Sequence, residues 1–275
     1  MFTKIKREVY LVQVNYRFGR NVFVPYSVGS LIAYAQTIPV IRDNFQFRSP
    51  SFLREDPKVV VARMNNPAVV GFYCYLWNWE YNQKLAKLVR VMYPNALIIF
   101  GGNQTPNASL GFFLNYPYVD ILVHGEGEFT FADVLTESLC AKPDYSKISG
   151  VSVRMPGNVT LKTSERKRAK DLSVLPSPYL SGVFDFMLGM DLCLNVSQEN
   201  NRGCPYTCMF CDWGKDKHKL VQIPEMRILA EFEWFGQNHV EYLLSCDANY
   251  GILPRDQRLT EKMIEIREKH SGYPR

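Results

Sequence analysis

The sequence predicts an α/β fold: a parallel sheet covered by helices, followed by the opening strand–helix units of an α/β barrel. Three observations support this prediction. Short apolar runs alternate with segments of helical spacing over residues 1–145, glycine-rich turns follow two of those runs, and the alternation starts again at Asp191. Strands joined by crossover helices pair in parallel and wind right-handed, so the alternation predicts a parallel sheet.

The expected strands of the first region are compact apolar runs, as in strands covered on both faces. They span 9–14, 68–73, 96–100 and 119–123, and the expected helices span 28–35, 81–92 and 128–140. Pro94 stops the second helix. Ligands of such sheets bind at the carboxyl ends of the strands, so the glycine-rich loops after Phe100 and Val123 form the expected ligand edge.

We expect three regions along the chain: an α/β domain over 1–145, a hairpin and linker over 146–188, and the start of a barrel over 189–275. The hairpin pairs 150–154 with 159–162 around a glycine turn, and the prolines of 175–179 stiffen the connector. Beyond it, strands at 192–196 and 240–245 alternate with helices at 224–236 and 259–269, as at the opening of an α/β barrel or half-barrel.

Composition excludes several classes of protein. The chain has 275 residues, 47% hydrophobic and 21% charged, which excludes wholesale disorder. No apolar run reaches the roughly 20 residues of a membrane span, and no signal peptide is recognisable, so we expect a cytoplasmic protein without a membrane partner. The net charge is +5, and its one dense basic stretch, 162–170, is interpreted as a solvated connector, so no nucleic-acid partner is expected.

Three of the seven cysteines, Cys204, Cys208 and Cys211, lie in a C-x3-C-x2-C arrangement. Three thiolates on one loop can hold three irons of a [4Fe–4S] cluster and leave the fourth iron with an open position. A structural zinc site needs four ligands, and His218 and His239 do not stand at a suitable spacing. Zinc and three buried, unliganded cysteines remain the alternatives.

The cysteine motif resembles that of the radical S-adenosylmethionine (radical SAM) superfamily, with Phe210 at its aromatic position. The resemblance implies a [4Fe–4S] cluster on the three cysteines, S-adenosylmethionine chelated at the open iron, and reductive cleavage to a 5′-deoxyadenosyl radical. It also implies that Asp247 and Asn249, after the second barrel strand, hold the methionine part of S-adenosylmethionine. The superfamily's usual Gly-Gly-Glu form is absent there, and a capped turn is the other interpretation of these two residues.

An α/β domain ahead of this motif resembles the cobalamin-binding branch of the superfamily, whose domain is a flavodoxin/Rossmann-like parallel sheet followed by a radical SAM partial TIM barrel. That branch has three marks: D-x-H-x-x-G, S-x-L and a Gly-Gly pair, with a further glycine-rich loop at the corrin edge. The matching cobalamin-binding candidates are Tyr26, Gly29, Cys74, Leu76, Gly101, Gly102, Gly125, Glu126 and Gly127. Tyr26 occupies the histidine position, which implies base-off cobalamin without histidine ligation.

The resemblance implies a cobalamin-dependent radical SAM enzyme that methylates or rearranges an unactivated carbon. Its partners would be a small-molecule or natural-product substrate and an electron donor such as flavodoxin or ferredoxin. Only two strand–helix units follow the linker, so we expect an incomplete barrel that a second chain would complete. Two alternatives stay open: a truncated, non-catalytic fragment that binds cobalamin and the iron–sulfur cluster, and a flavodoxin-like regulatory domain with a zinc loop.

Overall fold

The computed structural model describes residues 5–211 and 220–275. It divides into two compact units, each described by itself below. Unit 1 comprises Met1–Tyr16 and Ser27–Arg168, and unit 2 comprises Arg17–Tyr26 and Ala169–Arg275.

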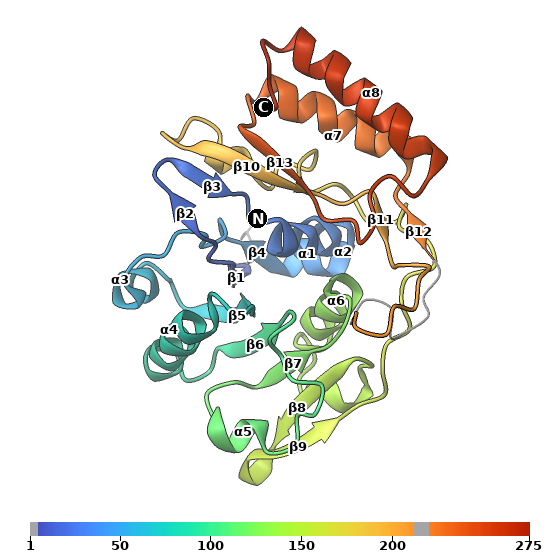
Figure 1. The fold of residues 1–275 in the computed structure, drawn as a ribbon. Coiled ribbons are helices and arrows are strands. Elements are labelled where there is room, and N and C mark those ends of the chain that lie inside the picture. Colours follow the sequence, from blue (N-terminus) through green and yellow to red (C-terminus); the bar gives the residue numbers. More distant parts are fainter. Residues whose placement is uncertain (1–4, 212–219) are drawn as a thin grey trace. The chain divides into compact units, whose positions relative to one another are not determined.

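Unit 1 is built on a sheet of order β4-β1-β5-β6-β7-β8-β9 (Figure 1). Its first five strands are parallel, and in chain order they give the arrangement 2-1-3-4-5 of a flavodoxin-like fold. The predicted parallel α/β fold is therefore confirmed. These strands are β1 (Arg7–Val12), β4 (Phe45–Phe47), β5 (Pro67–Tyr73), β6 (Leu97–Gly101) and β7 (Ile121–Val123).

Helices cover both faces of this sheet (Figure 1). They are α1 (Tyr26–Thr37), α2 (Pro39–Asn44), α3 (Pro57–Ala62), α4 (Trp79–Met92), α5 (Phe112–Asn115) and α6 (Gly127–Glu137). In α4, Tyr81, Leu85 and Val89 recur every four residues and are buried, so one stripe of the helix faces the sheet. The helix ends at Met92 and is capped by Tyr93, directly before the predicted stop at Pro94.

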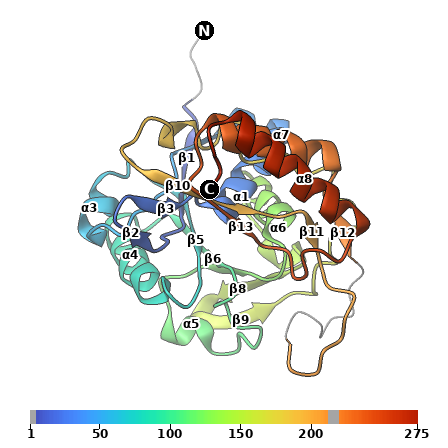
Figure 2. The same ribbon diagram turned by 45° about the horizontal axis from the view of Figure 1, so that its top comes forward.

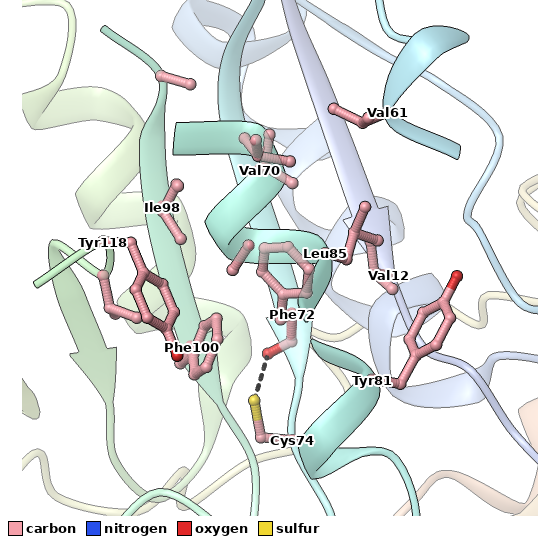
Figure 3. Packing of buried hydrophobic residues seen from close by; sticks show 14 of the residues in the cluster. Val12, Val61, Val70, Phe72, Cys74, Tyr81, Leu85, Ile98, Phe100 and Tyr118 are labelled. Carbon is pink, nitrogen blue, oxygen red and sulfur yellow. Dashed lines mark hydrogen bonds between the residues drawn. The ribbon is translucent and has the colours of Figure 1, made fainter. Parts of the chain in front are cut away.

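Figure 3 shows how α4 packs on the strands. Val70 and Phe72 of β5 and Ile98 of β6 lie against Leu85 in one buried cluster. Each such side chain contributes about 1.5–3 kcal/mol by leaving water. This core holds the carboxyl ends of β5 and β6 at a fixed separation.

The hairpin predicted between the two domains extends the first sheet instead. Strand β8 (Val151–Met155) pairs antiparallel with β7, and β9 (Val159–Lys162) pairs with β8. Val151 and Val153 are buried, so the strand gains apolar contacts by joining the sheet. The turn between them is the short 3-10 segment Pro156–Asn158, and another such segment, Tyr145–Lys147, precedes β8.

Unit 2 is built on a sheet of order β13-β10-β3-β2. Strand β10 (Cys193–Gln198) pairs in parallel with β13 (Tyr242–Ser245) on one side and with β3 (Asn21–Phe23) on the other. Strand β2 (Arg17–Phe18) closes a small hairpin with β3. The predicted barrel strands are confirmed, whereas the pairing of residues 17–23 with β10 was not predicted.

Helices α7 (Glu225–Gln237) and α8 (Pro254–Lys269) lie side by side over this sheet, as both ribbon views show (Figures 1 and 2). A two-stranded ribbon, β11 (Asn201–Arg202) with β12 (Val221–Gln222), flanks the cysteine segment. A 3-10 segment, Asp185–Met187, precedes β10.

Among the described helices, none combines the length and the apolar character that a membrane crossing requires.

Candidate functional site

The cysteine motif occupies a loop that starts at the carboxyl end of the first barrel strand. After β10 and β11, Gly203 adopts φ +103°, a left-handed conformation that glycine reaches without strain, and Cys204 follows it. Cys204 is buried, Cys208 is exposed and Cys211 is partly buried, and all three are free thiols. The amide of Cys211 donates to the carbonyl of Cys208 (3.0 Å), which folds the end of the motif into a turn.

The three sulfurs share this loop without forming a ready-made metal site. Within residues 5–211 and 220–275, no three Cys, His, Asp or Glu side chains converge as a metal-holding group. Phe210 is 94% exposed and Met209 98% exposed, so the loop presents apolar side chains as well as thiols. The donor set itself, three thiols on one accessible loop, fits an iron–sulfur cluster with one open iron. Of the two zinc alternatives, His218 lies outside the described residues, and His239 packs against Tyr273.

Asn249 is the predicted site residue that the structure brings to the motif. Its Nδ2 lies 2.9 Å from the sulfur of Cys204 and donates a hydrogen bond to it. Amide donors to a thiolate stabilise its charge, and hydrogen bonds to the sulfurs help to set the reduction potential of an iron–sulfur cluster. Asn249 therefore acts directly on the first thiol of the motif.

Asp247 lies next to the motif, but its carboxylate is engaged by the chain. It accepts hydrogen bonds from the amides of Asn200 (2.7 Å) and Asn201 (3.0 Å), and from Asn200 Nδ2 (2.8 Å). These contacts hold the turn that connects β10 to β11. The structure thus gives Asp247 a role in shaping the approach to the cysteines.

A buried polar network that was not identified from the sequence also fixes this turn. Arg255 is buried and donates to the carbonyls of Asn200 (2.7 Å) and Ile223 (2.6 Å), and burial lowers the pKa of its guanidinium. In α7, Glu231 is 1% exposed, accepts from Gln198 (2.9 Å), and pairs with Arg227 (2.9 Å). Charged residues on helices are typical of solvated faces, so no sequence signal distinguishes these buried ones.

The side chain of Tyr26, at the histidine position of the cobalamin mark, contacts two residues of unit 2. Its ring stacks on Tyr179 with centroids 5.7 Å apart, and its hydroxyl donates to Glu199 (3.1 Å). Glu199 also accepts two hydrogen bonds from Arg202, at 2.8 and 3.0 Å. Burial raises the pKa of the Tyr26 phenol well above its ordinary value. The tyrosine thus stays neutral and donates a hydrogen bond.

In unit 1 the structure brings the second and third cobalamin marks together. The amide of Cys74 donates to the carbonyl of Gly101 (2.6 Å), and that of Gln104 donates to the carbonyl of Cys74 (3.1 Å). Gly102 adopts φ +101°, and a Cβ there would lie 2.7 Å from the Cys74 carbonyl oxygen. Only glycine permits this approach of the two loops.

The side chains of the second mark point in different directions. The Cys74 thiol is buried in the core, as Figure 3 shows, and burial raises its pKa. Leu76 is 76% exposed, and Trp77 packs on Tyr75 with centroids 4.0 Å apart. Trp79 packs on Phe100 in the core. Leu76 is thus an exposed apolar side chain of this loop.

The other predicted cobalamin residues lie at the ends of helices α1 and α6. Gly29 is buried in the first turn of α1. Gly125 adopts φ +68° with open space where a Cβ would stand, and Gly127 lies against Leu31, 3.1 Å from the Cβ position. Glu126 precedes α6 and pairs with Arg168 (3.0 Å).

Comparison with known proteins extends this picture. No family model matches the chain. It is 38% identical over 274 residues to the 2-(S-pantetheinyl)-carbapenam-3-carboxylate methyltransferase of Streptantibioticus cattleyicolor, covering 98% of this chain and 39% of that protein. It is 39% identical over 274 residues to the cobalamin-dependent radical SAM methyltransferase TokK of Streptomyces tokunonensis, with the same coverage. The chain thus spans about two fifths of the length of these relatives.

A solved structure shows the same fold. The cobalamin-dependent S-adenosylmethionine radical enzyme OxsB, with aqua-cobalamin and S-adenosylmethionine bound, superposes with a TM-score of 0.68 at 16% identity. The match covers 96% of this chain and 37% of OxsB. The fold and the relatives together define the class: the chain is homologous to part of the cobalamin-dependent radical SAM enzymes, and the resemblance seen in its motifs is confirmed. Both of the relatives described above are named as methyltransferases.

Proposed function

We propose that this chain is part of a cobalamin-dependent radical SAM enzyme that methylates an unactivated carbon of a small-molecule or natural-product substrate. The observation that carries the proposal is the loop of three free thiols at the carboxyl end of β10, in a chain 39% identical to a cobalamin-dependent radical SAM methyltransferase. Rearrangement of the carbon skeleton is the second reaction type open to the same cofactors.

Cys204, Cys208 and Cys211 would hold the [4Fe–4S] cluster in unit 2. When bound, the cluster and S-adenosylmethionine supply radical generation, and cobalamin supplies a methyl carrier. Asn249 donates to the first thiolate, and Asp247 fixes the turn that leads into the loop. Phe210, exposed on the loop, would lie against the bound S-adenosylmethionine and exclude water from it.

Cobalamin would bind at the carboxyl edge of the unit 1 sheet. Gly101, Gly102 and Gly125 offer backbone that a corrin or its nucleotide tail can approach closely, and Leu76 offers an exposed apolar contact. The Tyr26 hydroxyl donates a hydrogen bond to Glu199, which supports cobalamin binding without ligation by this residue.

The proposal implies further partners. An electron donor such as flavodoxin or ferredoxin would reduce the cluster, and a second chain or further segment would complete the barrel. We also propose a cytoplasmic location, because thiolates that hold a cluster must remain reduced.

Anaerobic reconstitution of the full chain with iron and sulfide tests the cluster assignment. The wild-type chain should bind four irons and four sulfides, and Cys208→Ala should lose the cluster because only two thiolates remain. The matched control is Cys140→Ala, which removes an exposed thiol from unit 1 and should leave the cluster intact. A full cluster in Cys208→Ala, or zinc without sulfide in the anoxic wild type, would contradict the proposal.

Methyl transfer by the reconstituted chain separates the enzyme from its alternative. Turnover of S-adenosylmethionine with cobalamin bound supports a catalytic protein. Binding of both cofactors without any turnover supports the truncated, non-catalytic fragment, and turnover restored by a second chain supports a divided barrel.

A further inference from the structure

The segment that joins the first barrel strand to the cysteine loop is bracketed by an ion pair. Glu199 follows the last residue of β10, and Arg202 stands two residues before Cys204. The guanidinium and the carboxylate form a two-pronged pair, with Nε to Oε1 at 2.8 Å and Nη2 to Oε2 at 3.0 Å. Both side chains are largely buried, at 13% and 16% exposed. Such a fork fixes orientation as well as distance.

A third group, from a remote segment, completes this pair. Tyr26 lies 173 positions before Glu199, and its hydroxyl donates to Oε2, the oxygen that also accepts from Arg202 Nη2. Two donors on one carboxylate oxygen restrict rotation of the carboxylate. Tyr26 therefore holds the Glu199 end of the Glu199–Arg202 fork.

The position of the Tyr26 hydroxyl is itself defined by packing. The ring stacks on Tyr179, whose own hydroxyl donates to the carbonyl of Ser197 in β10 (2.6 Å). Tyr179 is buried and meets Phe235 of α7 edge to face, with centroids 4.8 Å apart. The contacts of Tyr179 with α7 and β10 therefore fix the ring of Tyr26, and the hydroxyl of Tyr26 in turn fixes the Glu199 carboxylate.

We propose that Tyr26 is a positioning residue for the cluster: through Glu199 and Arg202 it fixes the segment that delivers Cys204. The inference rests on the proposed function, because it assumes a cluster on the three cysteines. Tyr26, at the histidine position of the cobalamin mark, would thus act on the radical SAM site. Asp247 and Arg255 form hydrogen bonds with the polypeptide backbone of the same turn. Tyr26 acts instead on the Glu199–Arg202 side-chain pair.

The test compares Tyr26→Phe with wild type in the full, anaerobically reconstituted chain. The phenylalanine keeps the ring on Tyr179 and removes the hydroxyl that donates to Glu199. We expect unchanged iron and sulfide content, an altered midpoint potential and electron paramagnetic resonance spectrum of the reduced cluster, and S-adenosylmethionine affinity weakened about threefold to tenfold. The matched control is Tyr34→Phe, on the same helix and packed on Phe129.

A double-mutant cycle shows whether the effect passes through Glu199. Glu199→Gln alone should shift the cluster potential, and adding Tyr26→Phe to it should shift the potential no further. Glu199→Gln also tests the contact from its other side if Tyr26→Phe does not fold. An unmoved potential in either single variant, or fully additive shifts in the double variant, would overturn the proposal.

Two further outcomes are informative about where Tyr26 acts. A variant in which only hydroxocobalamin affinity changes would place Tyr26 at the cobalamin site and overturn the inference. Absence of a four-iron cluster in the wild-type chain would instead defeat the proposed function, so the two failures are distinguishable.

Discussion

The loops at the carboxyl ends of the two sheets differ in how completely hydrogen bonds and packing within the chain fix their structure. In unit 1, the loops after β5 and β6 are joined by backbone hydrogen bonds between Cys74, Gly101 and Gln104, and Gly102 lies against Cys74. In unit 2, the turn before the cysteines is tightly held, yet the three sulfurs beyond it do not converge among the described residues. In unit 1, backbone packing fixes the loops at the sheet edge. In unit 2, the chain fixes only the turn that leads to the three cysteines.

The two cofactors of the proposed function would account for this difference. A corrin approached through glycine backbone needs a surface that is already formed. Thiolates that surround a cluster repel one another without the metal, so the cluster contributes part of the folding energy of its own loop. We therefore expect substitutions in unit 1 to weaken cobalamin binding by disturbing the packing of its loops. In unit 2, we expect cluster binding to weaken when a cysteine, or a residue that holds the turn before the cysteines, is replaced.

The largest stability effect expected at the unit 1 edge is that of Gly102→Ala. The new Cβ would lie 2.7 Å from the Cys74 carbonyl oxygen at a backbone φ of +101°, so backbone must move. We expect a loss of about 3 kcal/mol in unfolding free energy, measured by urea titration, with weaker cobalamin binding. Gly111→Ala has a similar φ of +76° but open space, and should lose only about 1 kcal/mol. Equal losses in the two variants would contradict the close-approach argument.

Asp247→Asn tests the anchored part of the cysteine segment. The amide offers one acceptor oxygen to three donors that the carboxylate now satisfies. We expect unfolding free energy to fall by about 1–3 kcal/mol with no S-adenosylmethionine present. A variant with wild-type stability but weakened S-adenosylmethionine binding would show that Asp247 acts on the cofactor alone.

His124 provides a smaller, pH-dependent effect in unit 1. Its Nε2 lies 2.8 Å from the Ser152 hydroxyl, and burial, together with Lys162, lowers its pKa below 6.5 despite the opposing charge of Glu165. The unfolded chain then binds the proton more readily, so stability falls as pH drops through 6.5 towards the folded pKa. We expect His124→Asn to remove a pH dependence of below about 1 kcal/mol, measured by urea titration between about pH 7.5 and 5. An unchanged pH dependence of stability in His124→Asn would contradict this assignment.

The smallest expected effect is that of Glu233→Gln in the α7–α8 contact. Hydrogen bonds from Lys269, Gln237 and His270 lower the Glu233 pKa to about 2. Its stabilisation is present above the ordinary pKa of 4.5 and is lost as pH falls towards 2. The site is solvent-accessible, so we expect the substitution to cost only about 0.5 kcal/mol at neutral pH. Glu261→Gln, paired with exposed Gln257, is the control, and the same loss there would contradict a specific α7–α8 contact.

The elements predicted from sequence are those with a long, regular pattern. The apolar run 68–73 and the helical spacing through Leu85 and Val89 appear in the structure as β5 and α4. Strands of two or three residues, such as β2 and β3, carry no pattern of their own. Their conformation depends on pairing with β10, which lies far along the chain, so local sequence does not predict it.

The residues of the candidate site also differ in whether the sequence predicts them. Spacing alone singled out the three cysteines, because thiols at those intervals are rare outside metal loops. The surrounding network of Glu231 and Arg255 escaped notice, since charged residues in helical segments are typical of solvated faces. Tyr26 was identified by its place in a cobalamin mark, whereas its contacts lie with Tyr179 and Glu199. A position in a motif indicates where a residue stands along the chain, and only the fold determines which group it meets.

The pairing of β3 with β10 has a consequence for how the molecule can be divided. Residues 17–26 are separated from the remainder of unit 2 by residues 27–168 of unit 1, so no single cut releases unit 2 intact. A fragment starting at Ala169 would present β10 with one unpaired edge, which invites association with other chains. Synthesis on the ribosome meets the same constraint, because the early hairpin must wait for its partner strand to emerge.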